Sequence, residues 1–325
     1  MKKKVLVTGA NGFVGSNLVR ALLKERYEVT CLVRKTSNLE TLEGLPVTFA
    51  NSDYHSVSSL HEACKGQDII FHIAAKVREI SQKRYFDANV AVTSNLMKAI
   101  HGSSVEKCVF LSTQAAAGPC SHKYSKTEDD VSNPVSYYGK SKLEAEKVIK
   151  NECPVPWVIV RPSSVYGPGD KDFFKYFELI EKGIAPLAGF KKKYISLIFT
   201  EDLIDLLIKC MEKDVANDQV FFASDGAVYS FDDFIDTLTE VMKKKVVKVR
   251  VPIFLSYTGA FFNECRKFFT GKQAILNIQK VKEARQLYWL CSIDKAKKTL
   301  QFQPKTTLEE GLEKTYIWYK EHGWL

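Results

Sequence analysis

The chain has 325 residues, 45% of them hydrophobic, and a formal net charge of +9. This length can build two structural regions around one large core, and the composition is ordinary for a water-soluble globular protein. The basic residues are scattered, and no helix-turn-helix, zinc-finger or stacking-aromatic pattern accompanies them, so we do not expect a nucleic-acid partner. A mildly basic surface suits anionic small molecules instead.

The cysteines and the N-terminus indicate the cellular compartment. The eight cysteines include no CxxC pair, which is typical of reduced thiols in a cytoplasmic protein. The N-terminal lysines are followed by only three apolar residues before Thr8 and Gly9, too few for a secretory signal peptide. No window is long and apolar enough to span a bilayer. We therefore expect a cytoplasmic protein without a membrane span.

The first half of the chain alternates β-branched apolar runs with segments of helical periodicity. Residues 4–10 predict a strand, 15–25 a helix and 28–34 a second strand, and this rhythm continues to Pro162. Such alternation predicts a parallel sheet covered by helices on both faces. The expected fold class is therefore α/β, a Rossmann-type doubly wound parallel sheet with a smaller, mostly C-terminal substrate-binding region.

The change of rhythm after Pro162 sets the expected organisation into regions. Glycine- and proline-rich loops, further helices and isolated strands follow it, and a few of these segments are expected to return to the main sheet. We predict that residues 1–166 with about 196–225 form the dinucleotide-binding domain, and that 167–195 with 226–325 form the substrate-binding region.

Three glycines stand between the first predicted strand and helix. Gly9, Gly12 and Gly15 permit a tight turn and close approach of a pyrophosphate to the helix N-terminus, which predicts a bound dinucleotide. At the end of the second strand, Arg34 and Lys35 occupy the place where an acidic residue would bind the ribose hydroxyl of NAD. Two cations favour the 2′-phosphate of NADP. NAD stays open, because both cations can also be ordinary surface residues.

Other residues at the carboxyl ends of the strands fit the same cofactor. Asp53 ends the third strand and is placed to accept a hydrogen bond from the adenine amino group. Ala74 and Ala75 follow the fourth strand, and their small side chains leave space along the edge where ligands of open α/β sheets bind. Asn89 either hydrogen-bonds near the site or caps its helix.

A tyrosine and a lysine lie one turn apart on a predicted helix. Tyr138 and Lys142 share a face. Phenol has a reference pKa near 10, so proton transfer at neutral pH needs a depression of ~3 units, worth ~4 kcal/mol, which we expect from Lys142 and the oxidised nicotinamide. Thr113 ends the preceding strand and can hold a substrate oxygen for general acid–base chemistry. Ser112 is the competing hydroxyl, but strand neighbours face opposite ways.

Five motifs together carry a resemblance: TGANGFVG, HIAA, FLST, YYGKSK and VRPSSVYGPGD. They resemble the extended branch of the short-chain dehydrogenases/reductases, also called the NAD-dependent epimerase/dehydratase family, over nearly the whole chain. The resemblance implies that Thr113, Tyr138 and Lys142 are catalytic, with Thr113 where the family more often has serine. It also implies that Lys142 bonds the nicotinamide ribose. The residues expected to contact the dinucleotide are Gly9, Asn11, Gly12, Phe13, Val14, Gly15, Arg34, Lys35, Asp53, Tyr54, Ala74, Ala75, Asn89, Tyr138, Lys142, Pro162 and Val165.

The resemblance also bears on the substrate. Of the stretch typical of nucleotide-sugar members after the sixth strand, the chain retains only the position of Asp202, whereas residues 288–325 look more like dihydroflavonol reductases and β-hydroxysteroid dehydrogenases. We therefore expect an NAD(P)-dependent oxidoreductase that acts on the carbonyl or secondary alcohol of a small, sterol-like or similar organic molecule. Nucleotide-sugar epimerase or dehydratase activity and a non-catalytic dinucleotide-binding role are the alternatives. A homodimer without a bound metal is expected.

Residues 251–271 concentrate aromatic side chains near several cations. Four interpretations stay open. The segment can form an apolar wall of the substrate pocket, pack simply against the sheet domain, lie as an amphipathic helix on a membrane surface, or form a dimer interface.

Overall fold

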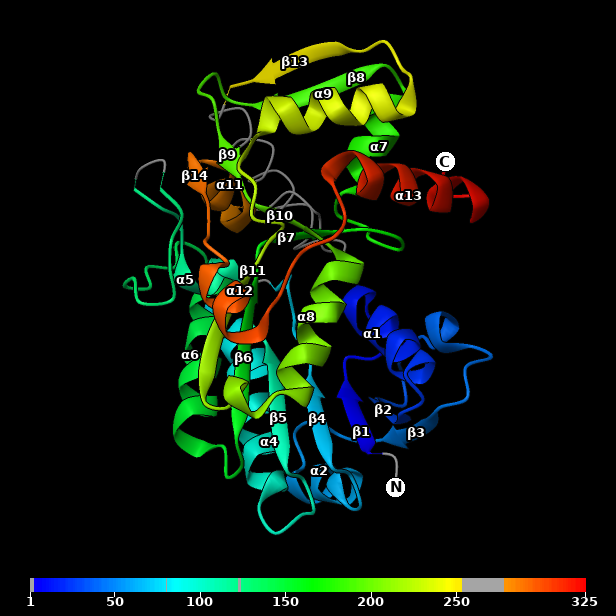
Figure 1. The fold of residues 1–325 in the computed structure, drawn as a ribbon, viewed down its shortest axis with the longest axis vertical. Coiled ribbons are helices and arrows are strands. Elements are labelled where there is room, and N and C mark those ends of the chain that lie inside the picture. The colour runs from blue at the N-terminus through cyan, green and yellow to red at the C-terminus, as the bar shows by residue number, and fades with distance from the viewer. Residues whose placement is uncertain (1–2, 80, 122–123, 253–277) are drawn as a thin grey trace.

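A seven-stranded sheet forms the centre of the computed structural model, which describes residues 3–79, 81–121, 124–252 and 278–325 (Figure 1). Its strands run in the order β11-β6-β5-β4-β1-β2-β3, and every neighbouring pair is parallel. The order reverses between β1 and β4, which makes the carboxyl ends of these strands a ligand-binding switch point. The predicted doubly wound α/β fold is confirmed.

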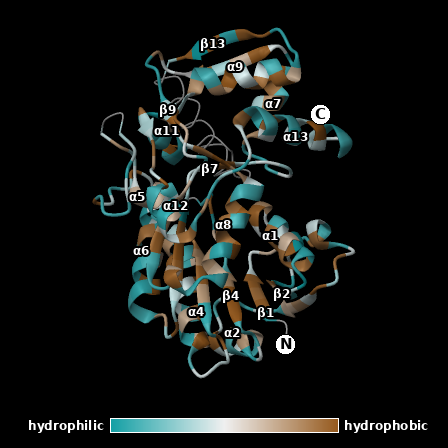
Figure 2. Ribbon diagram, in the orientation of Figure 1, coloured by the Kyte–Doolittle hydropathy of each residue, from teal (hydrophilic) through white to brown (hydrophobic). Residues whose placement is uncertain are grey.

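The strands of this sheet are short and largely buried. They are β1 (Lys4–Thr8), β2 (Glu28–Val33), β3 (Thr48–Asn51), β4 (Ile69–His72), β5 (Lys107–Leu111), β6 (Trp157–Pro162) and β11 (Gln219–Ala223). In Figure 2 their residues are mostly brown, while the helices are brown toward the sheet and teal on their outer sides. This pattern is what a parallel sheet covered on both faces requires.

Two layers of helices cover the sheet. The helices of this part are α1 (Phe13–Lys24), α2 (Val57–Cys64), α3 (Gln82–Phe86), α4 (Val92–Ile100), α5 (Gln114–Ala117), α6 (Tyr137–Glu152), α8 (Thr200–Glu212) and α12 (Asp294–Leu300), with a π-turn at Asp87–Ala91 and short 3-10 turns at Glu40–Leu42 and Asp214–Ala216. Val5 and Val7 pack in one core with residues of α1, α8 and α12. Leu6 packs in a second core with residues of α2, α4 and α6. Successive strand residues thus serve opposite layers.

A smaller C-terminal region stands on the carboxyl ends of the main strands, at the top of Figure 1. It consists of α7 (Phe174–Glu181), α9 (Phe231–Met242), α11 (Ile278–Ala284), α13 (Leu308–Glu321) and the short strands β7 (Ser164–Tyr166), β8 (Ile184–Ala188), β9 (Tyr194–Ile195), β10 (Leu197–Phe199), β12 (Tyr229–Ser230), β13 (Val247–Val251) and β14 (Tyr288–Trp289). These strands pair as β10-β7, β12-β9-β14 and β13-β8. Tyr166, Phe177, Phe234 and Tyr319 form its aromatic core.

The two regions share chain segments. Ala296, Leu300 and Phe302 are buried in the same core as Val5 and Phe221 of the main sheet, so α12 returns from the C-terminal part of the chain to cover β11. Part of the segment predicted to belong to the substrate-binding region therefore contributes to the sheet core. The aromatic segment 251–271 lies almost entirely outside the described residues, and the interpretations given for it remain predictions.

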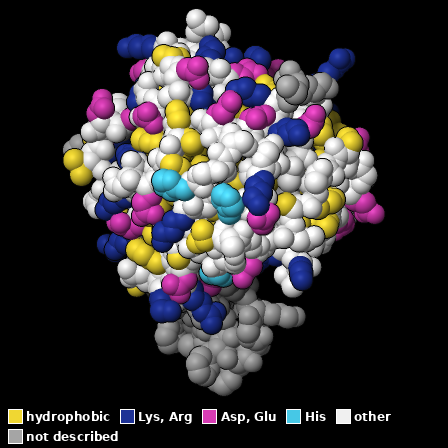
Figure 3. Space-filling view, turned by 90° about the horizontal axis from the view of Figure 1, so that it is seen from below, with side chains coloured by type: hydrophobic (Ala, Val, Ile, Leu, Met, Phe, Trp, Pro, Cys, Tyr) yellow, Lys and Arg dark blue, Asp and Glu magenta, His cyan; other side chains and the backbone are white. Residues whose placement is uncertain are grey.

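The surface mixes charges of both signs. On the face that Figure 3 shows, dark blue and magenta side chains are interspersed. Within the described ranges, no helix is both long and apolar enough to cross a membrane.

A buried ion pair fixes α6 against β6. The Nε of Arg161 donates to Glu146 Oε1 over 2.9 Å, and its Nη2 donates to Glu146 Oε2 over 2.6 Å. The two side chains are only 4% and 1% exposed. A charge buried this deeply is stable only with its partner. The pair therefore sets the position of the helix that begins with the two tyrosines.

Candidate active site

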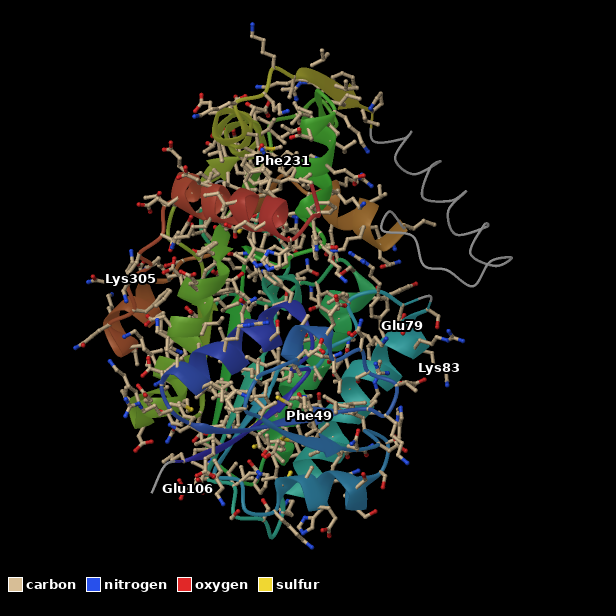
Figure 4. The ribbon with its side chains drawn as sticks, turned by 90° about the vertical axis from the view of Figure 1, so that its right-hand side faces the viewer. Phe49, Glu79, Lys83, Glu106, Phe231 and Lys305 are labelled. Atoms are coloured by element: carbon tan, nitrogen blue, oxygen red, sulfur yellow. The ribbon has the colours of Figure 1, made fainter. Side chains whose placement is uncertain are left out.

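A cavity of about 2010 Å³ opens where the main strands end. It is lined by residues of the glycine loop and by residues of α9, α11 and β13. Phe231, at the first position of α9, lines it from the upper region, above the sheet strand that carries Phe49 (Figure 4). The cavity therefore lies between the two regions, as expected for an open α/β sheet.

The glycine loop fits a dinucleotide pyrophosphate. Gly9 has φ +69°, and a Cβ there would lie 2.7 Å from backbone atoms of Ala74. A Cβ at Gly15 would overlap the Gly9 carbonyl oxygen, so both glycines are required for the tight turn. Gly12 caps α1 without any side-chain hydrogen bond. The first N–H groups of α1 are thus left for an anion, which the helix dipole also favours.

Most of the predicted cofactor residues line this one cavity. They are Gly9, Asn11, Gly12, Phe13, Val14, Gly15, Arg34, Asp53, Tyr54, Ala74, Ala75, Tyr138, Pro162 and Val165. Lys35 is exposed on the surface beside Arg34, and it is not among the lining residues. The side chain of Asp53 accepts a hydrogen bond from the His55 amide over 2.9 Å and still faces the cavity.

The tyrosine-bearing turn is held by a cap and by a close helix contact. Ser136 caps α6, and its hydroxyl accepts a hydrogen bond from the Gly139 amide over 3.1 Å. A Cβ added at Gly139 would overlap the Ala115 carbonyl oxygen of α5. Glycine at this position therefore lets α6 approach α5. The approach brings Tyr138 to Thr113, the residue that caps α5.

The two hydroxyls at the end of β5 face different partners. Ser112 donates to Glu146 Oε1 over 2.5 Å and is buried. Thr113 accepts from the Ala115 amide over 3.2 Å, and its side chain also hydrogen-bonds Tyr138, which lowers the pKa of that phenol. Thr113 is thereby placed beside the phenol, where it can bind the same substrate oxygen.

The electrostatics of Tyr138 differ from the sequence-based expectation. Removal of water by the surrounding protein outweighs the other effects and raises the pKa of Tyr138 to about 12. The cation that opposes this rise is Lys280 of α11. Lys142 instead places its ammonium 3.9 Å from the centroid of the Phe110 ring, and its side chain is not among those lining the cavity. Burial lowers the pKa of Lys142 to about 7, against the opposing charge of Glu146.

Asn89 belongs to a buried hydrogen-bond chain beneath the site. Its Oδ1 accepts from the Lys76 amide over 2.8 Å, and its Nδ2 donates to Ser141 Oγ over 2.9 Å. Ser141 in turn donates to the Tyr138 carbonyl oxygen over 2.8 Å. Asn89 lies in a short π-helical segment, Asp87–Ala91, and such segments within helices are frequent at functional sites. Asn89 thus braces the turn that carries Tyr138.

His72 continues this chain as a neutral core residue. Its Nδ1 lies 2.8 Å from Thr8 Oγ1, and its Nε2 lies 3.0 Å from Thr93 Oγ1. Thr93 donates to the Asn89 carbonyl oxygen over 2.6 Å. Burial, and secondarily the charge of Lys142, lowers the pKa of His72 to about 3. The ring therefore links β1, β4 and α4 without carrying charge near neutral pH.

Several lining residues were missed by sequence reasoning. Arg78 lines the cavity and pairs with Asp172, and Lys280 lines it and pairs with Glu283 over 3.0 Å. Arg78 could have been found from its place shortly after the HIAA motif. No pattern marks Lys280, because it reaches the site from a helix more than a hundred residues away in sequence from Tyr138. Gln114 also lines the cavity directly beside Thr113.

Comparisons with known proteins agree with this geometry. A model of the NAD dependent epimerase/dehydratase family matches residues 5–222. The chain belongs to this family. It is accordingly an NAD(P)-dependent enzyme of the extended short-chain dehydrogenase/reductase type with a small-molecule substrate, as the motifs implied.

Individual family members show which activities its relatives have. A UDP-glucose 4-epimerase of Vibrio cholerae is 32% identical over 97% of this chain and 95% of its own. A 3-beta-hydroxysteroid dehydrogenase of Mycolicibacterium neoaurum is 27% identical over 98% of this chain and 92% of its own. The crystal structure of a UDP-glucuronic acid 4-epimerase of Bacillus cereus with UDP-glucuronic acid and NAD is 25% identical, has a TM-score of 0.78, and covers 98% of this chain and 99% of its own.

The close contact at Gly139 gives a first prediction. Gly139→Ala should push α6 away from α5, destabilise the protein by ~1–3 kcal/mol through overpacking and lower turnover by about 10²-fold through misplacement of Tyr138. Urea unfolding and steady-state kinetics measure both effects. Lys140→Ala is the matched control, because Lys140 is exposed on the same turn. Equal stability and turnover in the two variants would contradict the role assigned to this glycine.

The buried histidine gives a second prediction. The unfolded chain binds a proton at His72 below about pH 6.5, whereas the folded chain does so only near pH 3. Stability should therefore fall as pH falls through this window, by up to ~1.4 kcal/mol per pH unit from this group. His72→Gln keeps a neutral hydrogen-bonding side chain and should flatten that slope. Urea unfolding at a series of pH values tests it, and an unchanged slope in the variant would show that His72 contributes nothing.

Proposed function

We propose that this protein interconverts two epimers of a nucleotide-diphosphate sugar. The observation that carries the proposal is the 32% identity to a UDP-glucose 4-epimerase over nearly the full length of both chains. The sequence led us to expect a carbonyl reductase, because the chain lacks most of the stretch that is typical of nucleotide-sugar members after the sixth strand. The identity to the epimerase changes that preference. That stretch is only one part of the substrate wall, so its absence does not remove the other groups that can bind a sugar nucleotide.

The charge of the cavity wall supports an anionic substrate. Lys191, Lys193 and Arg250 are among the residues of the C-terminal region that line the cavity. Arg250 is already oriented by Asp232, whose Oδ1 lies 2.6 Å from its Nη2. Cationic side chains in the wall of a cleft attract and orient a diphosphate.

The chain's own residues supply orientation and proton transfer. The nicotinamide of the bound cofactor supplies the hydride chemistry. Thr113 binds the oxygen of the sugar carbinol, and Tyr138 takes up the proton from that oxygen and later returns it. The glycine loop and the first turn of α1 hold the pyrophosphate of the cofactor. Epimerisation follows when the sugar presents its other face before the hydride is returned.

A carbonyl reductase or alcohol dehydrogenase is the second candidate. Its support is the 27% identity to a 3-beta-hydroxysteroid dehydrogenase over 98% of this chain. Both activities would use Thr113, Tyr138 and Lys142, so these residues do not distinguish an epimerase from a reductase. They differ in whether the hydride returns to the substrate or leaves with the dinucleotide.

The deciding experiment follows the fate of the hydride. Purified protein is incubated with UDP-glucose and either NADP or NAD, and formation of UDP-galactose is measured by NMR. Oxidation of NADPH and of NADH is measured in parallel against ketones, aldehydes and sterols. We expect sugar conversion without net change in the dinucleotide, and a loss of at least about 10²-fold in Tyr138→Phe. NADPH oxidation with a ketone and no sugar conversion would establish the second candidate. Dinucleotide binding with neither activity would indicate a non-catalytic protein.

The dinucleotide itself is tested at Arg34. We propose that Arg34, which lines the cavity, favours a 2′-phosphate, so NADP is bound in preference to NAD. Arg34→Ala should weaken NADPH binding by about tenfold or more and change NADH binding little. Isothermal calorimetry measures both affinities. Lys35→Ala is the control, because Lys35 does not line the cavity. Tighter binding of NADH by the wild-type protein would overturn this preference.

The homodimer and the cytoplasmic location remain predictions.

A further inference from the structure

Two buried polar side chains, Gln114 and Ser163, line the cavity beside the proposed reaction centre. The two residues are only 4% and 6% exposed. Within the part of the chain that the structure describes, Gln114 Nε2 and Ser163 Oγ have no hydrogen-bond partner. A buried polar group without a partner destabilises the folded state, and such groups are rare in native proteins. A ligand in the cavity can supply the missing partner.

These two residues lie at the same edge of the main sheet. Gln114 begins α5, shortly after β5 ends, and Ser163 directly follows β6. The two strands are parallel neighbours whose register pairs Leu111 with Val160, and Gln114 and Ser163 each lie three positions beyond that pair. Both residues therefore stand where the carboxyl ends of the strands meet the cavity, below the C-terminal region in Figure 1.

Gln114 is adjacent in sequence to a residue of the reaction centre. It directly follows Thr113, which binds the oxygen of the carbinol in the proposed function. Consecutive Cα atoms lie about 3.8 Å apart, so a side chain at position 114 can reach the substrate beside the oxygen that Thr113 binds. The hydroxyl of Ser112 at the same edge already donates to Glu146. Gln114 and Ser163 thus keep hydrogen-bonding capacity for a ligand.

The chemistry of the two groups fits a neutral hydroxyl. An amide carries donors and an acceptor, and the serine hydroxyl also donates and accepts, so together they match a group that does both. Neither residue carries a charge. A phosphate group has stronger partners elsewhere in the cavity wall, at Lys191 and Lys193.

We propose that Gln114 and Ser163 form a subsite for a second hydroxyl of the substrate, on the carbon next to the carbinol that gives up the hydride. This rests on the proposed function in that Thr113 binds the carbinol oxygen. The substrate class is a vicinal diol, such as a sugar ring, which becomes a hydroxyketone when the hydride passes to the nicotinamide and the proton to Tyr138. A substrate without the second oxygen leaves both buried groups unpaired and binds less tightly.

Binding of two matched sugar nucleotides tests the subsite without turnover. Tyr138→Phe protein, saturated with NADP or NAD, is titrated by isothermal calorimetry with UDP-glucose and with UDP-3-deoxyglucose, which lacks only the hydroxyl beside the reacting carbinol. We expect UDP-glucose to bind about tenfold more tightly, and this ratio should fall to about one when Gln114→Leu is added. Ser163→Ala should lower the ratio in the same direction.

A second buried glutamine supplies the matched control. Gln67 also has a side-chain atom, Oε1, with no partner in the described ranges, but it is not among the residues that line the cavity. Gln67→Leu should therefore leave the ratio of the two affinities unchanged. An equal change of the ratio in Gln67→Leu and Gln114→Leu would contradict a subsite at Gln114.

Thermal unfolding separates a binding role from a structural one. Gln114→Leu removes a buried amide group, so the ligand-free protein should keep or raise its melting temperature while it loses selectivity. A lower melting temperature together with weaker binding of both sugar nucleotides would show a structural role instead. Weaker binding of the dinucleotide with an unchanged sugar ratio would assign the two side chains to the carboxamide of the cofactor. Either result overturns the proposal.

Failure of the proposed function can be distinguished from failure of the subsite. If the protein binds no nucleotide sugar, oxidation of NADPH and of NADH is compared with 2-hydroxycyclohexanone and with cyclohexanone as substrates. The subsite predicts the same preference for the molecule with the second oxygen, and the same loss of that preference in Gln114→Leu. A protein that shows no such preference in either pair, or whose preference survives Gln114→Leu, overturns the proposal.

Discussion

The site depends on the fixed position of one helix. The buried pair of Arg161 and Glu146 ties the middle of α6 to β6, and loss of one partner from such a pair costs ~3–5 kcal/mol. Glu146 also accepts from Ser112, so the ion pair anchors the end of β5 as well. At its first turn the same helix is braced by Asn89 through Ser141. Strand end and helix start therefore move as one unit.

Much of this arrangement was predictable because its causes are local in sequence. Alternating apolar runs predict parallel strands, and three glycines after the first strand predict the cofactor loop, since the turn needs residues without Cβ atoms. Thr113 and Tyr138 could be placed together because one ends a strand and the other begins the helix that packs beside it. The glycine pattern lies within one strand, turn and helix, and Thr113 and Tyr138 lie within the consecutive segment β5-α5-α6.

The unpredicted features depend on contacts between distant segments. Helical spacing correctly places Lys142 one turn from Tyr138, but the direction of its side chain is decided by Phe110 and Glu146, which belong to its packing environment. Lys280 lines the cavity because its neighbour Gln279 accepts a hydrogen bond from the Tyr137 amide at the start of α6. No sequence pattern predicts that contact. The charge around a catalytic group is thus a property of the assembled core rather than of the motif.

The packing of α12 against the main sheet makes the sheet core depend on a late segment of the chain. The family model ends at residue 222, yet Leu300 and Phe302 complete the apolar layer that covers Phe221. A truncated chain without them would expose an apolar strand face, a condition that favours aggregation during synthesis. The apolar cover of β11 is therefore complete only when a segment about eighty residues later in the chain has packed against it.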